Sequence, residues 1–402
     1  MEQVITFNSE AIARVHRVEE LLNRAIRGYD KIAGALHLGG RKGSYDDINY
    51  EFEGGSSDSL RKKHYDKSLR LLWKAEQHAP WSSFRDLTND EHAVLTQAFE
   101  TLSADENRQL KQMRTDEFKN KLNAAYSPEQ KQALVNILSL IGHGEAYAWM
   151  VSAELLSHCK STGGRAAITM QVLEEAKHFV VLREIIQAFD CPIPRLPIYE
   201  YMLLERALKS KGVEKFFGMN VVVEGFALSL FGILSEMPCM EILKMFHRDE
   251  SRHTALPTNY LAEFPLTWWE RKSPFARMRR LMIVLPAVPF LAHIQEDFAV
   301  LGIDSFAFGG SMVRKILNLA ERVGFDLPLS RATVSELLND VFNAYCRYTR
   351  TEHEDKRFVE METTRGREQL KVESEIFQLS DIKAAKQKQL KRNITKLAQI
   401  NV

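Results

Sequence analysis

Three observations predict an all-α fold for this chain of 402 residues. Apolar residues recur at helical spacing along most of its length, and the apolar–polar alternation typical of half-buried strands is nearly absent. Clusters of proline and glycine fall between the long periodic segments. Hydrophobic residues make up 45% of the chain, enough for a sizeable core. We therefore expect a single all-α domain over residues 1–402.

The N-terminal part of the chain is expected to form helices that precede the segment with the chemistry. Ser9 can cap the first helix, which is expected to run to about Leu38. A loop rich in Gly, Ser and Asp follows over residues 39–59. Further helices are expected over residues 60–77, 90–99 and 104–125.

The middle of the chain is more regular and predicts five helices. Ser127 and Pro128 begin the first of them, and a turn over residues 161–164 ends it. An extended crossover is expected over residues 191–197, and Pro238 lies in the turn of a helical hairpin, at the start of its second arm. The five expected helices cover residues 128–160, 165–189, 198–209, 214–237 and 239–264.

The C-terminal part is expected to add two or three helices that end near Arg350. Its longest apolar run, residues 281–292, is about half a membrane span and contains Pro286 and Pro289, which predicts a buried, kinked helix. From residue 351 to 402 charged residues dominate, which favours an exposed helix or tail over a partner-docking segment.

Charge and cysteine usage exclude several classes of protein. The formal net charge is +1, from 54 basic and 53 acidic residues, so no overall attraction to nucleic acid or to an anionic membrane is expected. The first residues lack the basic and apolar regions of a signal peptide. The four cysteines, Cys159, Cys191, Cys239 and Cys346, are too dispersed for a disulfide framework or a thiolate zinc site. We expect a cytoplasmic protein.

Two Glu-x-x-His pairs carry the chemistry, Glu175 with His178 and Glu250 with His253. The i, i+3 spacing places a carboxylate and an imidazole on one face of a helix, where both can bind the same cation. An acid precedes each pair, Glu174 and Asp249. Such an acid lies about 100° around the helix from the glutamate that follows it, so it points at the neighbouring helix. There it can accept a hydrogen bond from the N–H of a metal-bound histidine.

A glutamate in an apolar helix precedes each pair. Glu145 comes before the first pair and Glu224 before the second. Pro238 lies midway between Glu224 and Glu250, so the two arms of that hairpin place both carboxylates at nearly equal height. Glu214 is a weaker alternative to Glu224 as the carboxylate that precedes the second pair. A buried glutamate in such a setting must be paired, protonated or bound to metal.

This order of Glu followed by Glu-x-x-His, twice, resembles the ferritin-like di-iron carboxylate superfamily. The segment RDESRH, residues 248–253, resembles its oxygen-activating branch: ribonucleotide reductase small subunits, monooxygenases, acyl carrier protein desaturases and N-oxygenases. The resemblance covers about a third of the chain and implies a four-helix core over residues 128–264. It implies metal ligands at Glu145, Glu175, His178, Glu224, Glu250 and His253.

The resemblance also implies cofactors and a reaction class. Two iron ions, or a manganese–iron pair, would activate O₂ to hydroxylate, N-oxygenate or desaturate a small apolar or aromatic substrate. An external electron donor such as a reductase or ferredoxin is expected, and no nucleic acid or membrane partner. The flanking helices can supply a substrate pocket, a homodimer surface or a reductase site. The alternatives are a ferritin-like iron- or ligand-binding protein without organic turnover, and a metal-free scaffold whose charged tail binds a partner.

The chain departs from the motifs of individual branches. Leu182 stands where the reductase subunit has its radical tyrosine, and Leu228 where monooxygenases often have threonine. Phe246 stands where N-oxygenases have an added histidine. The adjacent His247 is a candidate auxiliary ligand, weighed against a packing or surface role, whereas His143 and Glu154 are expected to point away from the site.

Residues one helical turn from the ligands are expected to line a substrate cavity. The set is mostly apolar, with the small Gly225 and Ala227 leaving room beside Glu224. Ser152, Gln171 and Thr254 can provide polar contacts. The predicted lining consists of Trp149, Ser152, Gln171, Phe179, Leu182, Ala227, Leu228, Phe231, Phe246 and Thr254.

Overall fold

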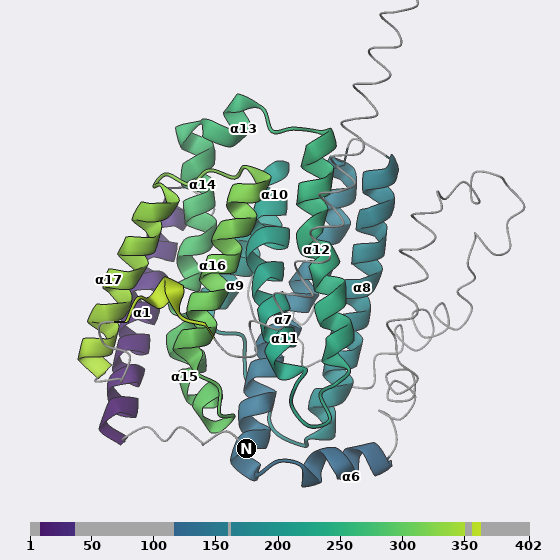
Figure 1. Cartoon of the computed structure of the whole chain (residues 1–402), viewed down its shortest axis with the longest axis vertical. Helices are drawn as coiled ribbons and strands as arrows, with labels where there is room; N and C mark the ends of the chain where they lie inside the picture. The colour runs from purple at the N-terminus through teal and green to yellow at the C-terminus, as the bar shows by residue number, and fades with distance from the viewer. Residues whose placement is uncertain (1–8, 37–115, 160–161, 350–355, 363–402) are drawn as a thin grey trace, which may run out of the picture. The chain divides into compact units, whose positions relative to one another are not determined.

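The computed structural model describes residues 9–36, 116–159, 162–349 and 356–362, and every regular element in those ranges is helical (Figure 1). The all-α prediction is confirmed. The chain divides into two compact units, one of residues 1–52 and 121–402 and the other of residues 53–120. The second unit is described only at residues 116–120, the start of α6 (Asp116–Ala124). The loop over residues 39–59 and the helices over 60–77 and 90–99 lie outside the described residues.

Four helical segments of the larger unit carry the predicted ligands. Helix α7 (Pro128–His158) pairs with α8 (Thr162–Ala188), and α11 (Glu224–Leu234) pairs with α12 (Leu243–Glu263), which also contacts α8. A capping box starts α7 where predicted: Ser127 Oγ accepts from the Gln130 N–H at 3.3 Å, and Gln130 Oε1 accepts from the Ser127 N–H at 3.1 Å. The turn predicted over residues 161–164 is wrong from Thr162 onward, where α8 already begins.

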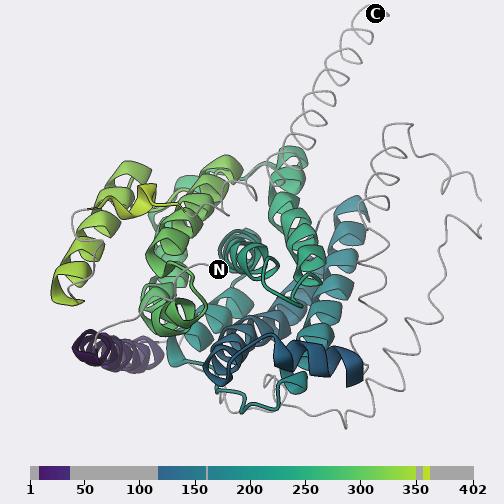
Figure 2. The same cartoon turned by 60° about the horizontal axis from the view of Figure 1, so that its bottom comes forward.

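A central helix runs through the middle of the larger unit (Figure 2). It consists of α10 (Val213–Phe216), a π-helical segment η3 (Phe217–Val223) and α11, and nearly all its side chains are buried. The π segment was not predicted, because a helix that is apolar on all sides has no periodicity to reveal a change of pitch. It delivers Glu224 as the first residue of α11.

The hairpin turn is wider than predicted. Helix α12 begins at Leu243 instead of residue 239, so Pro238 belongs to the turn and not to the first turn of a helix. Cys239 has a φ of 62°, in the left-handed region that ends helical continuity.

The kink predicted in the apolar run over residues 281–292 is confirmed, since a 3₁₀ turn containing Pro286 interrupts it.

More helices follow the core than the predicted two or three. The helices after α12 pack around the core together with α1 (Ser9–Ala35) and α9 (Ile198–Lys209). They are α13 (Trp268–Lys272), α14 (Pro274–Val284), η4 (Leu285–Ala287), α15 (Phe290–Val300), α16 (Ser305–Val323) and α17 (Arg331–Thr349).

A short part of the charged C-terminal segment packs on the bundle. Phe358 in η5 (Phe358–Glu360) is buried and stacks on Phe342 of α17, with ring centroids 3.7 Å apart. Arg314 of α16 donates to the Val359 carbonyl at 2.7 Å. The remainder of the predicted tail, residues 363–402, lies outside the described residues.

Two helical stretches among the described residues are long and apolar enough to cross a membrane by length and composition alone. Val213–Leu234 is the central helix, and 89% of its most apolar window is buried in the protein, as expected of a core helix. Pro274–Val300 is interrupted by η4, and 44% of its window is buried. Neither stretch is more than weak evidence for a membrane span.

Candidate metal centre

Two groups of four side chains can each hold a metal ion in the interior of the bundle. Within each group, one ligand atom per residue lies within 4.8 Å of the others. The groups are Glu145, Glu175, His178 and Glu250, and Glu175, Glu224, Glu250 and His253. All six residues predicted as ligands are therefore brought together. Glu175 and Glu250, here called the shared carboxylates, belong to both groups, whereas the outer carboxylates Glu145 and Glu224 belong to one each.

Helical spacing explains the local geometry. Helices α8 and α12 each present a carboxylate and an imidazole at i, i+3, on the face turned to the bundle interior. The outer carboxylates come from α7 and from the first residue of α11. Every one of the six residues is at most 3% exposed, so the centre is closed to bulk solvent. Such a concentration of buried acids is costly without cations to balance it.

The Glu145 half, formed by Glu145, His178 and the shared carboxylates, contains atoms with unmet hydrogen-bonding capacity. The buried atoms Glu145 Oε2, Glu175 Oε2, His178 Nδ1 and Glu250 Oε1 have no hydrogen-bond partner among the described residues. His178 Nδ1 nevertheless lies 3.0 Å from Glu250 Oε1 and 3.4 Å from Glu145 Oε2. Lone pairs that converge in this way, each costing about 1–3 kcal/mol if unmet, fit a cation between them.

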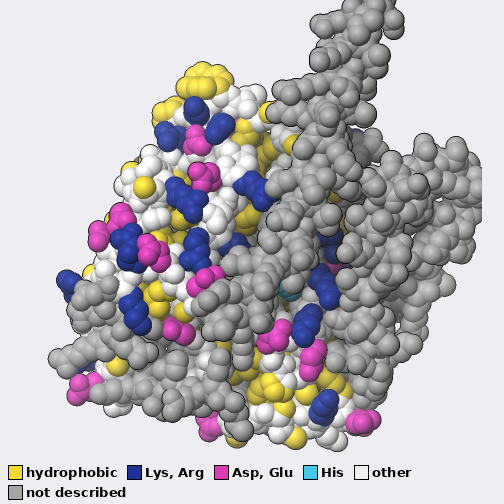
Figure 3. All heavy atoms as spheres, in the orientation of Figure 1, with side chains coloured by type: hydrophobic (Ala, Val, Ile, Leu, Met, Phe, Trp, Pro, Cys, Tyr) yellow, Lys and Arg dark blue, Asp and Glu magenta, His cyan; other side chains and the backbone are white. Residues whose placement is uncertain are grey.

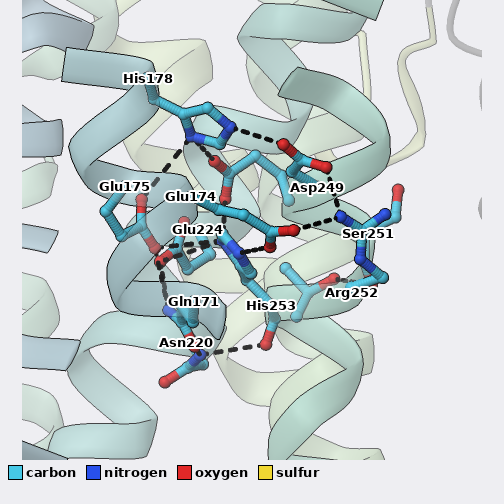
Figure 4. A network of polar contacts seen from close by, with 12 residues as sticks. Gln171, Glu174, Glu175, His178, Asn220, Glu224, Asp249, Ser251, Arg252 and His253 are labelled. Atoms are coloured by element: carbon cyan, nitrogen blue, oxygen red, sulfur yellow. Dashed lines mark hydrogen bonds and ion pairs between the residues drawn. The ribbon is translucent and has the colours of Figure 1, made fainter. Parts of the chain in front are cut away.

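The Glu224 half, formed by Glu224, His253 and the shared carboxylates, is hydrogen-bonded instead (Figure 4). His253 Nδ1 lies 3.1 Å from Glu175 Oε1 and 3.1 Å from Glu250 Oε2. Gln171 Nε2 donates to Glu175 Oε1 and to Glu224 Oε1, both at 3.0 Å. Both halves offer three carboxylates and one imidazole, but only in the Glu224 half does a neighbouring amide, that of Gln171, hold the carboxylates in place.

The acid before each Glu-x-x-His pair contacts the histidine of the other helix. His178 Nε2 donates to Asp249 Oδ2 at 3.1 Å, and His253 Nε2 donates to Glu174 Oε2 at 2.9 Å. Because a carboxylate only accepts, each Nε2 carries the hydrogen and each Nδ1 is left to face the ligand group. Arg252 joins the two acids, donating to Glu174 Oε1 at 2.7 Å and also to Asp249 (Figure 4).

Two buried amide side chains, Gln171 and Asn220, are hydrogen-bonded to each other beside the centre. This pair was not predicted from the sequence. Asn220, in the π segment η3, donates to Gln171 Oε1 at 2.9 Å and to the His253 carbonyl at 3.0 Å. Gln171 was predicted as cavity lining, but it contacts the ligands themselves. The sequence signal for Asn220 is a lone polar residue in the run FFGMNVVV, residues 216–223.

Burial and mutual charge shift the pKa values of the six side chains in opposite directions. Burial raises the pKa of both outer carboxylates well above the ordinary range of glutamate, and the shared carboxylates raise that of Glu224 further. Burial also acts to raise the pKa of both shared carboxylates, but the charges and hydrogen bonds of His253 and His178 together, with a hydrogen bond to Glu224 in the case of Glu250, outweigh it and the pKa is lowered. Burial opposes protonation of both imidazoles, but the surrounding carboxylates raise their pKa well above 6.5. A cation must therefore displace protons to bind.

Aromatic side chains cover the Glu145 half. The Phe246 ring stacks on the His178 ring, with centroids 4.2 Å apart, and the Phe231 ring meets it edge-on at 6.0 Å. Leu182 and Leu228 are fully buried, and Ala227 and Ser152 are buried too. Thr254 is buried but donates its hydroxyl to the Ser251 carbonyl at 3.1 Å, within its own helix.

Two predictions about the lining are wrong. Trp149 is 40% exposed and packs against the half-buried Phe179, with ring centroids 6.3 Å apart, so Trp149 does not line a closed cavity. Gly225 does not leave room for a substrate, because a Cβ there would lie 3.1 Å from Ile316 Cγ1 of α16. That glycine serves the close approach of two helices.

The remaining candidates fall outside the ligand groups. His247 is buried but belongs to neither group of potential ligands among the described residues. Glu214 is taken by a bidentate pair with Arg280, both contacts at 3.0 Å. His143 lies 3.4 Å from the Pro194 carbonyl, and Glu154 pairs with Lys215 at 2.6 Å.

The chain matches no protein-family model, no curated protein and no solved structure. The centre is therefore interpreted from its own residues, which form buried Glu and His groups that can hold metal ions.

Proposed function

We propose that the chain is a non-haem di-iron oxygenase with a ferritin-like four-helix core. One observation carries the proposal: two four-ligand groups share two carboxylates, so that two cations would be bridged. Four carboxylates and two imidazoles suit iron or manganese better than zinc, whose sites use fewer ligands and more nitrogen or sulfur. When bound, an iron pair supplies the capacity to reduce oxygen with electrons from an external donor.

The protein's own residues would orient the metal ions and exclude water. Glu175 and Glu250 would bridge, and each imidazole would bind one ion through Nδ1 while Asp249 or Glu174 holds its Nε2–H. Phe231 and Phe246 shield the Glu145 half with apolar surface. This shielding favours an apolar or aromatic substrate over a charged one.

The deciding experiment is oxygen uptake by full-length protein loaded with ferrous iron and supplied with a chemical reductant. A panel of arylamines, alkyl-aromatics and fatty acyl compounds is added in turn, with Glu175→Gln as the matched variant. We expect about two irons per chain and uptake that one compound class stimulates at least about ten-fold, with a new oxygen atom or double bond in the product.

The other outcomes separate the alternatives. Two irons per chain without any stimulated uptake would replace the oxygenase with an iron-binding protein. Less than half an iron per chain, unchanged in the variant, would leave a metal-free helical scaffold.

A further inference from the structure

The surface of α13 and the first turns of α14 carries an unusual concentration of exposed apolar side chains. Trp268 is 59% exposed, Trp269 70% and Phe275 77%, and Met278, one turn after Phe275, is half exposed. Figure 3 shows hydrophobic side chains over α13 with Lys and Arg side chains close by. Large aromatic residues are rarely left in solvent as a group unless the group binds something.

This aromatic surface is held in place by helix caps and by one buried arginine. Thr267 forms a capping box with Glu270 at the start of α13, and Ser273 caps α14. Arg280 of α14 is fully buried and donates to the carbonyls of Glu270 and Arg271 in α13. The two tryptophans, whose ring centroids are 4.9 Å apart, are thus presented from a fixed turn.

The anchor of this turn reaches the core. The Arg280 guanidinium forms its bidentate pair with Glu214 of α10 and lies over the Phe325 ring at 4.9 Å. A fully buried charge needs a counter-charge and hydrogen-bond acceptors around it. Arg280 finds these in Glu214 and in the α13 carbonyls, and so it connects the exposed turn to the start of the central helix.

The charge around the exposed aromatics is mainly positive. Residues 267–285 contain five basic side chains and one acid, Glu270, but Arg280 is buried and paired with Glu214, and Arg271 pairs with Asp326 at 3.6 Å. The Glu270 carboxylate is already used as acceptor at the start of α13, at 2.8 Å from the Thr267 N–H. Lys272 and Arg279 are exposed, and Arg271 is half exposed. The surface therefore presents positive charge beside tryptophan and phenylalanine.

Tryptophan with lysine and arginine on one amphipathic face is the composition that binds the headgroup region of anionic bilayers. Protein interfaces share the enrichment in aromatic residues, methionine and arginine, but they are depleted of lysine and usually carry both signs of charge at their rim. Lys272 and Arg279, both exposed beside the aromatics, favour the bilayer. The opposite face of α14 is packed in the bundle through Ala276 and Ile283, so this helix can lie on a bilayer but does not cross one.

We propose that α13 and the first turns of α14 form a docking surface for an anionic lipid bilayer, with Trp268, Trp269 and Phe275 at headgroup depth. The chain's net charge of +1 conceals this local positive charge, and so the sequence alone predicts no membrane partner. The proposal does not depend on the metal centre.

Co-sedimentation of the full-length protein with vesicles tests it. Vesicles of phosphatidylcholine with phosphatidylserine should bind the chain, vesicles of phosphatidylcholine alone should bind it much less, and salt should weaken binding. Trp268→Ser with Trp269→Ser should lower the bound fraction at least about ten-fold, and Lys272→Glu with Arg279→Glu should do the same. The tryptophan emission of the wild type should shift to the blue on binding.

The control is Leu337→Ser with Val341→Ser on α17, which removes two exposed apolar side chains, 52% and 47% exposed, elsewhere on the surface and should bind as the wild type does. Circular dichroism melting checks that each variant folds. Absence of binding by the wild type, or equal loss in the α17 control, would overturn the proposal. So would a dimer in sedimentation velocity without lipid that the tryptophan variant dissociates, because the surface would then be a contact between two copies.

Discussion

The two halves of the candidate metal centre share Glu175 and Glu250 but are supported differently. In the Glu145 half, the ligand atoms lack hydrogen bonds from the described residues, and aromatic rings surround the imidazole. In the Glu224 half, Gln171 donates to the outer and to a shared carboxylate, and Asn220 holds Gln171 in turn. Similar carboxylates are thus held by an amide hydrogen bond on one side and only by contacts with the His178 imidazole on the other.

This difference suggests separate tasks for the two halves. A carboxylate without hydrogen bonds can change its binding mode at little cost, whereas one held by a buried amide must break that bond first. In the oxygenase proposed above, the Glu145 half, beside the aromatic rings, would be the side that meets oxygen and substrate. The Glu224 half, whose carboxylates accept from Gln171, would hold its ion more firmly.

The largest effect should come from the shared carboxylates. Glu175→Gln or Glu250→Gln removes a ligand of both groups, so both ions should be lost, with affinities reduced more than about 100-fold. Glu145→Gln should lose only the ion of its own half. Metal per chain, measured by mass spectrometry after desalting, distinguishes the patterns, and a Glu175→Gln variant that keeps one ion fully would show that the halves are independent.

The pH dependence of metal affinity should be steep and positive. The outer carboxylates and both imidazoles have raised pKa values, so cations compete with protons at all four. Metal affinity is present at high pH and is lost as the pH falls through the raised pKa values. For the two imidazoles this loss should begin above pH 6.5. The slope should approach about ten-fold per pH unit for each proton displaced. Cobalt(II) titrations followed by visible absorption test this, and a flat profile would contradict it.

The acids that hold the imidazoles should act each on its own half. Asp249→Asn should weaken the ion bound by His178, and Glu174→Gln the ion bound by His253, each by about 10–100-fold. The exposed Glu236→Gln is the control with the same chemistry and should change nothing. Equal weakening of both ions by either variant would mean that Arg252, which joins the two acids, couples them.

The amide pair should have a smaller effect, confined to the Glu224 half. Gln171→Leu keeps the volume approximately but removes the donor to Glu224 Oε1 and to Glu175 Oε1, the oxygen of that shared carboxylate that lies near His253. Dissociation of the ion of this half should accelerate by about 3- to 10-fold. Asn220→Leu should reproduce part of the effect, since it acts through Gln171. The kinetics of metal release to a chelator resolve the two ions. Faster release from the Glu145 half would contradict the inference that the amide pair supports only the Glu224 half.

The smallest effect concerns the aromatic cover of the other half. Phe246→Leu removes the ring that stacks on His178 and should cost about 1–2 kcal/mol of unfolding free energy. Metal content should stay at the wild-type level, while the coupling between oxygen consumed and product formed should fall. Denaturant unfolding and product analysis measure the two quantities, and an unchanged coupling would argue against a substrate at this side.

Much of the fold and the ligand set could be predicted because they depend on local spacing. The shared face of each Glu-x-x-His pair follows from the rotation of about 100° per residue in an α-helix. The turn at Pro238 brings Glu224 and Glu250 into one group, as their similar distances from that turn predict. The same rule failed for Trp149. It gives the direction of a side chain from its own helix, but exposure depends on whether another helix covers that position.

The sequence by itself therefore determined the all-α class, the start of α7 and the two Glu-x-x-His pairs, because helix geometry alone relates the residues within each. The full set of six converging side chains was implied by the resemblance to the di-iron carboxylate bundles. The tertiary structure decided what depends on contacts between distant segments. These include the Asn220–Gln171 amide pair, the Glu214–Arg280 anchor and the approach of α16 at Gly225. The physical reason is that hydrogen bonds and close packing across the bundle leave no periodic trace in either segment, and become visible only when the helices are placed side by side.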